Sequence, residues 1–381
     1  MYNSPMDWLS GSKQTQVKKL IAQLADAAKR DQAARELIGM GEDAAQPLID
    51  ALQSQDLNLI LYYQHILARI PSALPHLIKA LATAHPIVRG RVVEVFSISK
   101  DKNAIPALLE AVKGEFFTVR SRAALALSAI GDARIIPALF PLLKDGEDEV
   151  RIAACVAIGK FRDPSTFDEI TNILLDDPKI EVRQAAAKVL GETKHPAAIP
   201  FLMEALRDSF WWYEKEQSAK VLLDAIEGMG QGIVDPLIEA LADREVTVRK
   251  YAAMVLGNLK DIRAIEELGM AVYDLHHEVS QAAAEALAKF GAPAIGLLSE
   301  ALRHPEAAVR EHAVIGLGKI QDARVAPFLI EMLRDPDRDV KKQAILSLVE
   351  LKDPRAAAPL REIANDRADR ELSILVKQLM G

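Results

Sequence analysis

The sequence predicts an all-α protein, a right-handed α-α superhelix (solenoid) of about eleven two-helix repeats. Three observations support this prediction. A Val-Arg pair recurs at a nearly constant spacing, a proline precedes most of these pairs by 12 or 13 residues, and apolar residues between the markers follow helical spacing. Self-similarity at a fixed period indicates stacked repeats, because one short helix pair cannot bury its apolar face alone.

The Val-Arg marker defines the period. Most successive pairs are separated by 30 to 32 residues, and one interval of 66 residues spans two periods plus a few residues. The series comprises Val88-Arg89, Val119-Arg120, Val150-Arg151, Val182-Arg183, Val248-Arg249, Val279-Ser280, Val309-Arg310 and Val340-Lys341.

The proline marker predicts the first helix of each repeat. Proline is tolerated in the first helical turn, where the missing N–H would have no partner. The apolar residues that follow, such as Leu202, Met203 and Leu206, lie at helical spacing. The markers are Pro47, Pro75, Pro106, Pro137, Pro200, Pro236, Pro327 and Pro359.

The second helix follows a short polar break that contains aspartate. It carries the Val-Arg pair, then small alanines, then leucine and often glycine, as in the run from Val182 to Gly191. We expect the glycine to end this helix in a left-handed cap. The predicted organisation is an N-terminal tail with capping helices over residues 1–42, followed by the solenoid over residues 43–381.

These motifs resemble HEAT repeats. Within that family, the linkers Gly131-Asp-Ala-Arg-Ile-Ile-Pro137 and Gln321-Asp-Ala-Arg-Val-Ala-Pro327 are similar to the short HEAT-like repeats of phycobilisome-lyase-type proteins. The resemblance implies an armadillo-like helical fold. It implies little about function, because the motif residues build the repeat and the family has many roles.

Composition narrows the function classes. The net charge of −7 argues against general nucleic-acid binding, which requires a basic surface. A single cysteine, Cys155, is typical of a reducing compartment, and no apolar run reaches the length of a membrane span. We therefore expect a cytoplasmic protein that does not bind membranes. Terminal repeats that look closed favour a monomer.

The arginines of the Val-Arg series have two interpretations. They either hold an acidic partner or pair with aspartates at the entrances of second helices, such as Asp145 and Asp335. An aspartate there caps the helix and also meets an arginine of its own or an adjacent repeat. We favour the structural interpretation.

The HEAT resemblance implies that the second helices line the concave face. Positions two, three and six after the marker valine then point into the groove, in a mixture of residue types typical of interfaces. The predicted partner-binding residues on this face are Arg91, Arg122, Tyr251, Met254 and His312.

The repeat over about 195–230 is irregular and longer than the others. It contains the aromatic run Phe210-Trp211-Trp212-Tyr213 where a Val-Arg pair is expected, followed by a glycine-rich link. Clustered Trp and Tyr are favoured as binding anchors, so this run joins the predicted partner-binding residues. The alternative is that these aromatics fill a bend between two stacks of repeats.

No catalytic, cofactor-binding or metal-binding residues are predicted. The related deoxyhypusine hydroxylases bind two irons through His-Glu pairs, but here His277-Glu278 is the one pair in that order. Cys155 lies among alanines and is predicted to be a small buried residue.

The leading hypothesis is a non-catalytic scaffold or adaptor that binds a protein or peptide on the concave face. One alternative, implied by the phycobilisome-lyase resemblance, is attachment or detachment of a bilin. A metal-dependent hydroxylase and a nucleic-acid binder are weaker alternatives, the latter because Glu94 and Glu285 interrupt the groove.

Overall fold

The computed structural model describes residues 5–208, 211, 216–366 and 369–380, and these residues form helices joined by short turns. No strand occurs among them. The chain divides into two compact units, residues 1–189 and 190–381, with the boundary inside one helix. The all-α solenoid predicted from the repeats is confirmed.

The first unit begins with two helices that precede the repeats, α1 (Pro5–Gln23) and α2 (Arg30–Met40). Five helix pairs follow. They are α3 (Glu42–Ala51) with α4 (Leu57–Leu67), α5 (Leu74–Thr83) with α6 (Pro86–Ser99), α7 (Ile105–Ala111) with α8 (Phe117–Ile130), α9 (Ile136–Leu139) with α10 (Asp148–Gly159), and α11 (Phe167–Asp176) with α12 (Ile180–Thr193).

The second unit contains six further pairs, so the described part of the chain has eleven, as predicted. They are α13 (Ile199–Arg207) with α15 (Glu216–Gly228), α16 (Val234–Ala240) with α17 (Val246–Leu259), α18 (Ile265–Ala271) with α19 (His277–Ala288), α20 (Ile295–Ala301) with α21 (Ala307–Lys319), α22 (Ala326–Met332) with α23 (Arg338–Leu351), and α24 (Ala357–Asn365) with α25 (Arg370–Met380).

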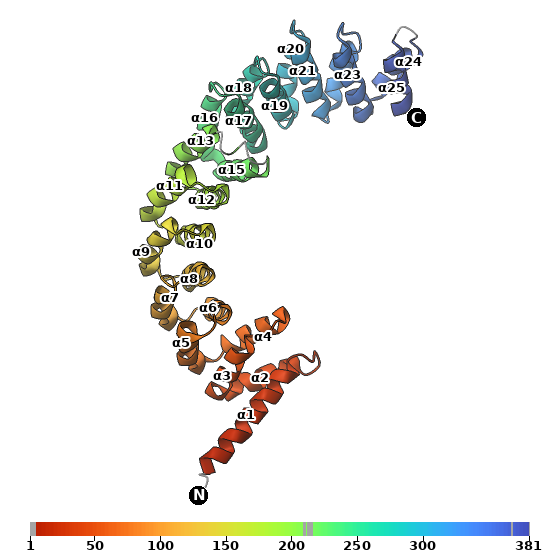
Figure 1. The fold of residues 1–381 in the computed structure, drawn as a ribbon. Coiled ribbons are helices and arrows are strands. Elements are labelled where there is room, and N and C mark those ends of the chain that lie inside the picture. The colour runs from red at the N-terminus through yellow and green to blue at the C-terminus, as the bar shows by residue number, and fades with distance from the viewer. Residues whose placement is uncertain (1–4, 209–210, 212–215, 367–368, 381) are drawn as a thin grey trace. The chain divides into compact units, whose positions relative to one another are not determined.

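Within each unit the helices form two layers (Figure 1). Second helices pack on second helices, as α6 does on α8 and α19 on α21, whereas first helices such as α5 and α7 form the other layer. The core lies between the layers and consists mainly of leucine, valine and alanine side chains. Because each pair is covered by its neighbours, burial depends on stacking.

The linker between repeats is built by local hydrogen bonds. Gly131 adopts a left-handed conformation at φ 78° and ends α8, as predicted for a glycine cap. The next residue, Asp132, accepts a hydrogen bond from the amide of Arg134 at 3.1 Å and pairs with the Arg134 side chain. This capping explains why the Asp-Ala-Arg linker recurs.

Gly191 has a different role from the predicted helix cap. It lies inside α12, and a Cβ at this position would be 2.7 Å from the Cα of Ala225 in α15. The left-handed position falls three residues later, on Lys194 at φ 53°. The prediction was wrong because this glycine permits close contact between helices of neighbouring repeats, a requirement that local sequence does not reveal.

Candidate functional site

Four arginines of the Val-Arg series connect neighbouring repeats. Each guanidinium donates two hydrogen bonds to the carboxylate of an aspartate 25 or 26 residues later, with distances of 2.6 to 3.1 Å. We call this series the Arg–Asp ladder. Its pairs are Arg120–Asp145, Arg151–Asp177, Arg249–Asp274 and Arg310–Asp335.

The same side chains also hold the turns in place. Arg310 donates from Nη1 to the carbonyls of His304 and Pro305, both at 2.9 Å, while Asp335 accepts from the amide of Asp337 at 2.8 Å. Burial raises the pKa of Asp335, but the hydrogen bonds from Arg310 and the Asp337 amide outweigh this effect and lower the pKa overall. The structural interpretation of these arginines is confirmed.

In the first unit, the structure places two of the predicted partner-binding residues differently. Arg91 is half-buried, and its Nη1 donates to the carbonyls of Leu52 and Ser54. Arg122 is exposed, with its guanidinium 3.9 Å from the carboxylate of Glu94. Arg122 therefore presents a charge to solvent, whereas Arg91 is occupied in tying a turn to the next repeat.

In the second unit, Met254 lies in a surface groove between α17 and α19. The groove has a volume of about 260 Å³, and the Met254 side chain is 39% exposed. Tyr251, one turn earlier, is half-buried, and the Lys250 ammonium lies 5.6 Å from the centre of its ring. We call this the α17/α19 groove, lined by Lys250, Met254, Glu278, Gln281, Ala282, Glu285, Ala286 and Lys289.

Charged residues around the α17/α19 groove pair across repeats. Lys250 contacts Glu278 at 2.7 Å, and Glu285 contacts Lys319 of α21 at 2.9 Å. Hydrogen bonding to Lys250 lowers the pKa of Glu278, so its carboxylate stays ionised. The groove thus has an apolar centre, formed by Met254 and two alanines, within a rim of both charges.

His312 is buried and belongs to a polar chain rather than to the surface. It is 1% exposed, and its ring stacks on His277 with centroids 4.6 Å apart. The Ser280 hydroxyl donates to the Val272 carbonyl at 2.6 Å. Because that hydroxyl has one hydrogen, Nδ1 of neutral His312 donates to Ser280 at 2.8 Å, and Nε2 accepts from His277 Nδ1 at 2.6 Å.

This burial predicts pH-dependent stability. Burial lowers the pKa of His312 to about 4, with a further contribution from His277 and an opposing one from Glu285. Because the pKa is lower in the folded state, stability is fully present above about pH 6.5 and is lost as the pH falls towards 4. At pH 5 the loss from this residue is about 2 kcal/mol.

The measurement compares urea unfolding at pH 7 and pH 5 in wild type and His312→Gln. We expect the variant to lose about 2 kcal/mol less stability between these two pH values, whatever its stability at pH 7. The same change at exposed His65 provides the matched control. An unaltered pH dependence in His312→Gln would contradict the prediction.

The aromatic run of the irregular repeat is described only at Trp211. This side chain is fully buried, and its Nε1 has no hydrogen-bond partner among the described residues. Phe210, Trp212 and Tyr213 lie outside the described residues. Trp211 itself offers no surface to a partner, and the alternative that these aromatics fill a bend between two stacks of repeats stays a prediction.

A family model described as HEAT repeats matches residues 74–154, 136–223, 234–303 and 295–379. The matches cover most of the chain and follow the helix pairs described above. This chain belongs to the HEAT-repeat family. The narrower likeness to phycobilisome-lyase-type repeats stays a prediction.

Solved structures similar to this HEAT-repeat chain include the karyopherin Kap121p and Kap95p. Kap121p matches with a TM-score of 0.61 at 14% identity, covering 97% of this chain and 49% of its own. Kap95p matches with a TM-score of 0.55 at 14% identity, covering 96% and 59%. The chain thus spans about half the length of Kap121p, and at this identity the likeness shows the fold alone. A search of curated proteins finds no match.

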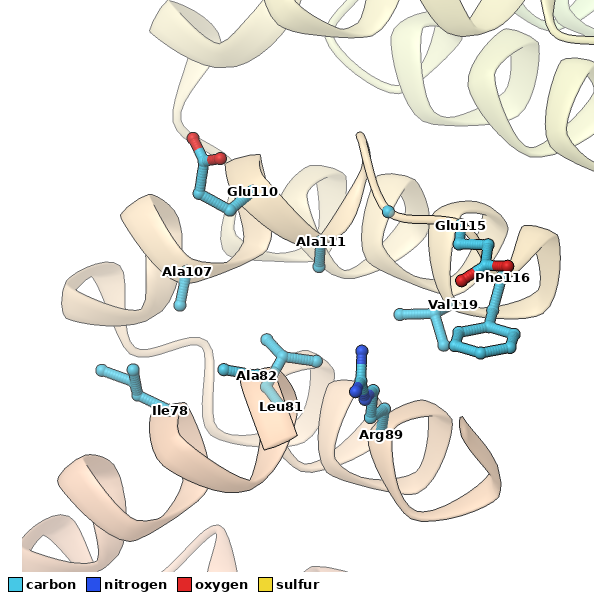
Figure 2. A pocket seen from close by; sticks show the side chains of 11 residues that line it. Ile78, Leu81, Ala82, Arg89, Ala107, Glu110, Ala111, Glu115, Phe116 and Val119 are labelled. Atoms are coloured by element: carbon cyan, nitrogen blue, oxygen red, sulfur yellow. The ribbon is translucent and has the colours of Figure 1, made fainter. Parts of the chain in front are cut away.

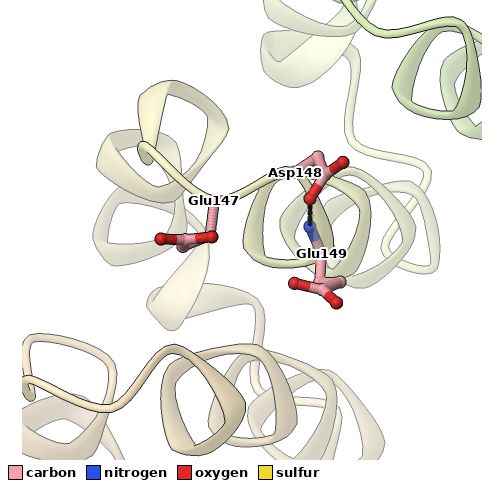
Figure 3. A group of neighbouring side chains, drawn as sticks. All are labelled: Glu147, Asp148 and Glu149. Carbon is pink, nitrogen blue, oxygen red and sulfur yellow. Dashed lines mark hydrogen bonds between the residues drawn. The ribbon is translucent and has the colours of Figure 1, made fainter.

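Three neighbouring carboxylates occur at the start of α10 in the HEAT stack. Ligand oxygens of Glu147, Asp148 and Glu149 lie within 4.8 Å of one another (Figure 3). Glu147 and Glu149 are exposed, and negative charge is favoured at a helix N-terminus, which accounts for their presence. They therefore give no evidence of a metal site.

Cys155 of α10 is buried, as predicted. Burial raises the pKa of its thiol to about 12, so the thiol stays protonated and unreactive at neutral pH. Among the described helices, none combines the length and apolar content needed to cross a bilayer.

Of the residues that line the α17/α19 groove, Met254 was predicted to bind a partner and Glu285 was placed in the groove, whereas Lys250, Glu278, Gln281 and Lys289 were not predicted. The rule for groove positions, applied to Val279, would have selected Gln281, Ala282 and Glu285. Although Ser280 replaces the marker arginine, α19 keeps the register of the other second helices, and these positions line the groove.

Proposed function

We propose that this HEAT-repeat chain is a non-catalytic scaffold or adaptor that binds a protein or peptide partner on the face formed by its second helices. The proposal includes the monomeric state and cytoplasmic location expected from the sequence, and it requires no cofactor. Its main support is the α17/α19 groove, where exposed Met254 lies within a rim of charged residues.

The composition of this groove favours a polypeptide partner. Protein interfaces commonly combine an apolar centre, often with methionine or an aromatic residue, and a polar rim that remains near water. Met254 provides a flexible, polarisable contact, and Tyr251 lies one turn away. Lys250, Glu278 and Glu285 supply charges of both signs, which suit the mixed side chains of a peptide better than a polyanion.

The repeats also provide a preorganised platform. The Arg–Asp ladder joins consecutive repeats through two-pronged ion pairs, so the second helices on either side of a groove are held in register. A surface that is already ordered loses less entropy on binding than a flexible one.

Kap121p, a karyopherin with a similar fold, supports the same class of function by analogy. Kap121p has been solved bound to Nup53p, Pho4p and Ste12p. Those complexes concern Kap121p, and they support the proposal only as an analogy between similar folds. Partner identity does not transfer to this chain at 14% identity.

The experiment begins with capture of partners from the native extract, followed by titration of the purified partner. Met254→Glu places a charge in the groove, and we expect the affinity to fall about tenfold or more. The matched control is Met270→Glu on α18, since Met270 is 69% exposed but lies outside the groove. We expect Met270→Glu to bind as wild type does.

Two results would count against the proposal. If Met254→Glu and Met270→Glu both bind as wild type, the partner does not use the α17/α19 groove. If the captured material turns out to be nucleic acid or a small molecule, the adaptor class itself is wrong. Trp211 is unsuitable for this experiment, because substituting a fully buried tryptophan tests folding rather than binding.

A further inference from the structure

The Arg–Asp ladder lacks a carboxylate between the repeats of α6 and α7. Arg89 occupies the arginine position on α6, but the residue 25 positions later is Gly114 instead of an aspartate. The backbone shows that the two positions correspond. The Gly114 amide donates to the Ala111 carbonyl at 3.2 Å, as the Asp145 amide donates to the Leu142 carbonyl at 3.2 Å.

Arg89 consequently makes its hydrogen bond within its own repeat, and its contact with the next repeat is to an aromatic ring. Its Nε donates to the carbonyl of Ala84 at 2.6 Å, and the guanidinium carbon lies 5.7 Å from the centre of the Phe116 ring. Among the described residues, no carboxylate lies within ion-pair distance of Arg89. In the ladder pairs, by contrast, Nε and Nη2 both reach the aspartate of the next repeat.

A cavity of about 290 Å³ occupies the space beside this guanidinium (Figure 2). Its walls are largely apolar and come from both repeats, with Ile78 and Leu81 on α5 and Ala107 and Ala111 on α7. The guanidinium of Arg89 projects into this space in Figure 2. The site therefore offers a cation within an apolar recess.

Two glutamates also line the cavity. Glu110 is exposed and contacts Lys113 at 2.9 Å, so its charge is already matched. Glu115 is exposed and lies beside Phe116 in Figure 2, outside ion-pair distance of Arg89. Rotation of its side chain would bring the Glu115 carboxylate nearer to Arg89. The experiment therefore includes a variant that removes the charge of Glu115.

We propose that this cavity binds an aspartate or glutamate side chain of a partner polypeptide, which supplies the carboxylate that the ladder lacks at Gly114. The neighbouring repeats show how a guanidinium at this position holds a carboxylate, with two hydrogen bonds at 2.8 Å in the Arg120–Asp145 pair. The proposal concerns a different surface from the α17/α19 groove and does not depend on it.

A polypeptide fits this cavity better than a small anion. The apolar walls match the aliphatic neighbours of an acidic residue in a peptide, and exposed Phe116 extends the apolar surface at the edge. The planar fork of arginine is suited to two-pronged binding of a carboxylate. A lone inorganic anion would leave the apolar walls uncovered.

The probes are the capped peptides acetyl-Leu-Asp-Leu-amide and acetyl-Leu-Asn-Leu-amide, titrated into the full chain by calorimetry. Their caps remove terminal charges, so the peptides differ only in the central carboxylate. We expect the Asp peptide to bind about tenfold or more tightly than the Asn peptide, since hydrogen bonds to charged groups are the stronger ones.

The deciding variant is Gly114→Asp, which restores the ladder within the chain. Gly114 has an ordinary backbone conformation, and the nearest atom to a new Cβ is the Ala111 carbonyl oxygen at 3.2 Å, so the change is sterically demanding but local. We expect Gly114→Asp to unfold at a higher temperature than Gly114→Asn and to lose the preference for the Asp peptide. If Gly114→Asp does not fold, Arg89→Gln takes its place and should also lose the preference.

Several outcomes would overturn the proposal. Equal affinity for the two peptides, or no detectable binding of either, would do so. Gly114→Asp that binds the Asp peptide as wild type does would place that peptide elsewhere. Finally, the Asp peptide could bind to the Glu115→Gln variant and not to wild type. That result would show that the chain's own Glu115 is the partner of Arg89.

Discussion

Arg310→Ala is expected to destabilise the C-terminal repeats by about 3–5 kcal/mol. The variant leaves the Asp335 carboxylate, which is 3% exposed, without its cation in an environment that disfavours an isolated charge. It also removes the donors to the His304 and Pro305 carbonyls, so one deletion affects both the ion pair and the turn.

The matched control is Arg324→Ala. Arg324 pairs with Asp322 at 2.6 Å, but its side chain is 67% exposed, and such pairs contribute less than about 1 kcal/mol. Arg310→Lys should fall between the two, because lysine keeps the charge and loses the two-pronged geometry.

Urea unfolding followed by circular dichroism gives the change in stability, and hydrogen exchange shows where it occurs. Repeat proteins can unfold in sections, so we expect α21 to α25 to lose protection before the rest of the second unit. An Arg310→Ala variant within 1 kcal/mol of wild type would show that the ladder is not a main source of stability.

Gly257→Val is expected to destabilise the second unit by about 3 kcal/mol. Gly257 is buried in α17, and a Cβ there would lie 2.7 Å from both the Cα and the Cβ of Ala286 in α19. The backbone of α19 cannot yield as a flexible side chain would, so the two helices must separate. Gly257→Ala should show a smaller loss in the same direction.

Gly39→Ala is the control for the effect of replacing a helical glycine that makes no close contact. Gly39 lies in α2, is exposed, and has nothing within 4 Å of a new Cβ. Alanine should therefore stabilise the protein by about 0.5–1 kcal/mol, because it reduces the entropy lost on folding. Thermal unfolding of Gly257→Val, Gly257→Ala and Gly39→Ala measures the change in stability of each variant. If Gly257→Ala also proved stabilising, the close contact between α17 and α19 would be absent in solution.

The candidate site could be predicted from sequence only in part. The rule for groove positions selected Met254 and Arg122, which are exposed, but also His312, which is buried. His312 differs because Ser280 replaces the ladder arginine of α19, and the histidine of the next repeat forms a hydrogen bond with it. A rule that counts positions from the marker valine of one helix takes no account of which residue the neighbouring repeat places opposite them.

The sequence by itself determined the all-α class, the period, about eleven helix pairs and the capping of α8 by Gly131. These features depend on interactions within one repeat, namely the 3.6-residue period, proline in a first turn and aspartate caps, all of which act over a few residues. The tertiary structure alone decided that Gly191 and Gly257 are contact points and that Arg89 lacks a carboxylate. Each of these depends on which atoms of the next repeat come within reach, about 30 residues away in the chain, and only packing brings them together.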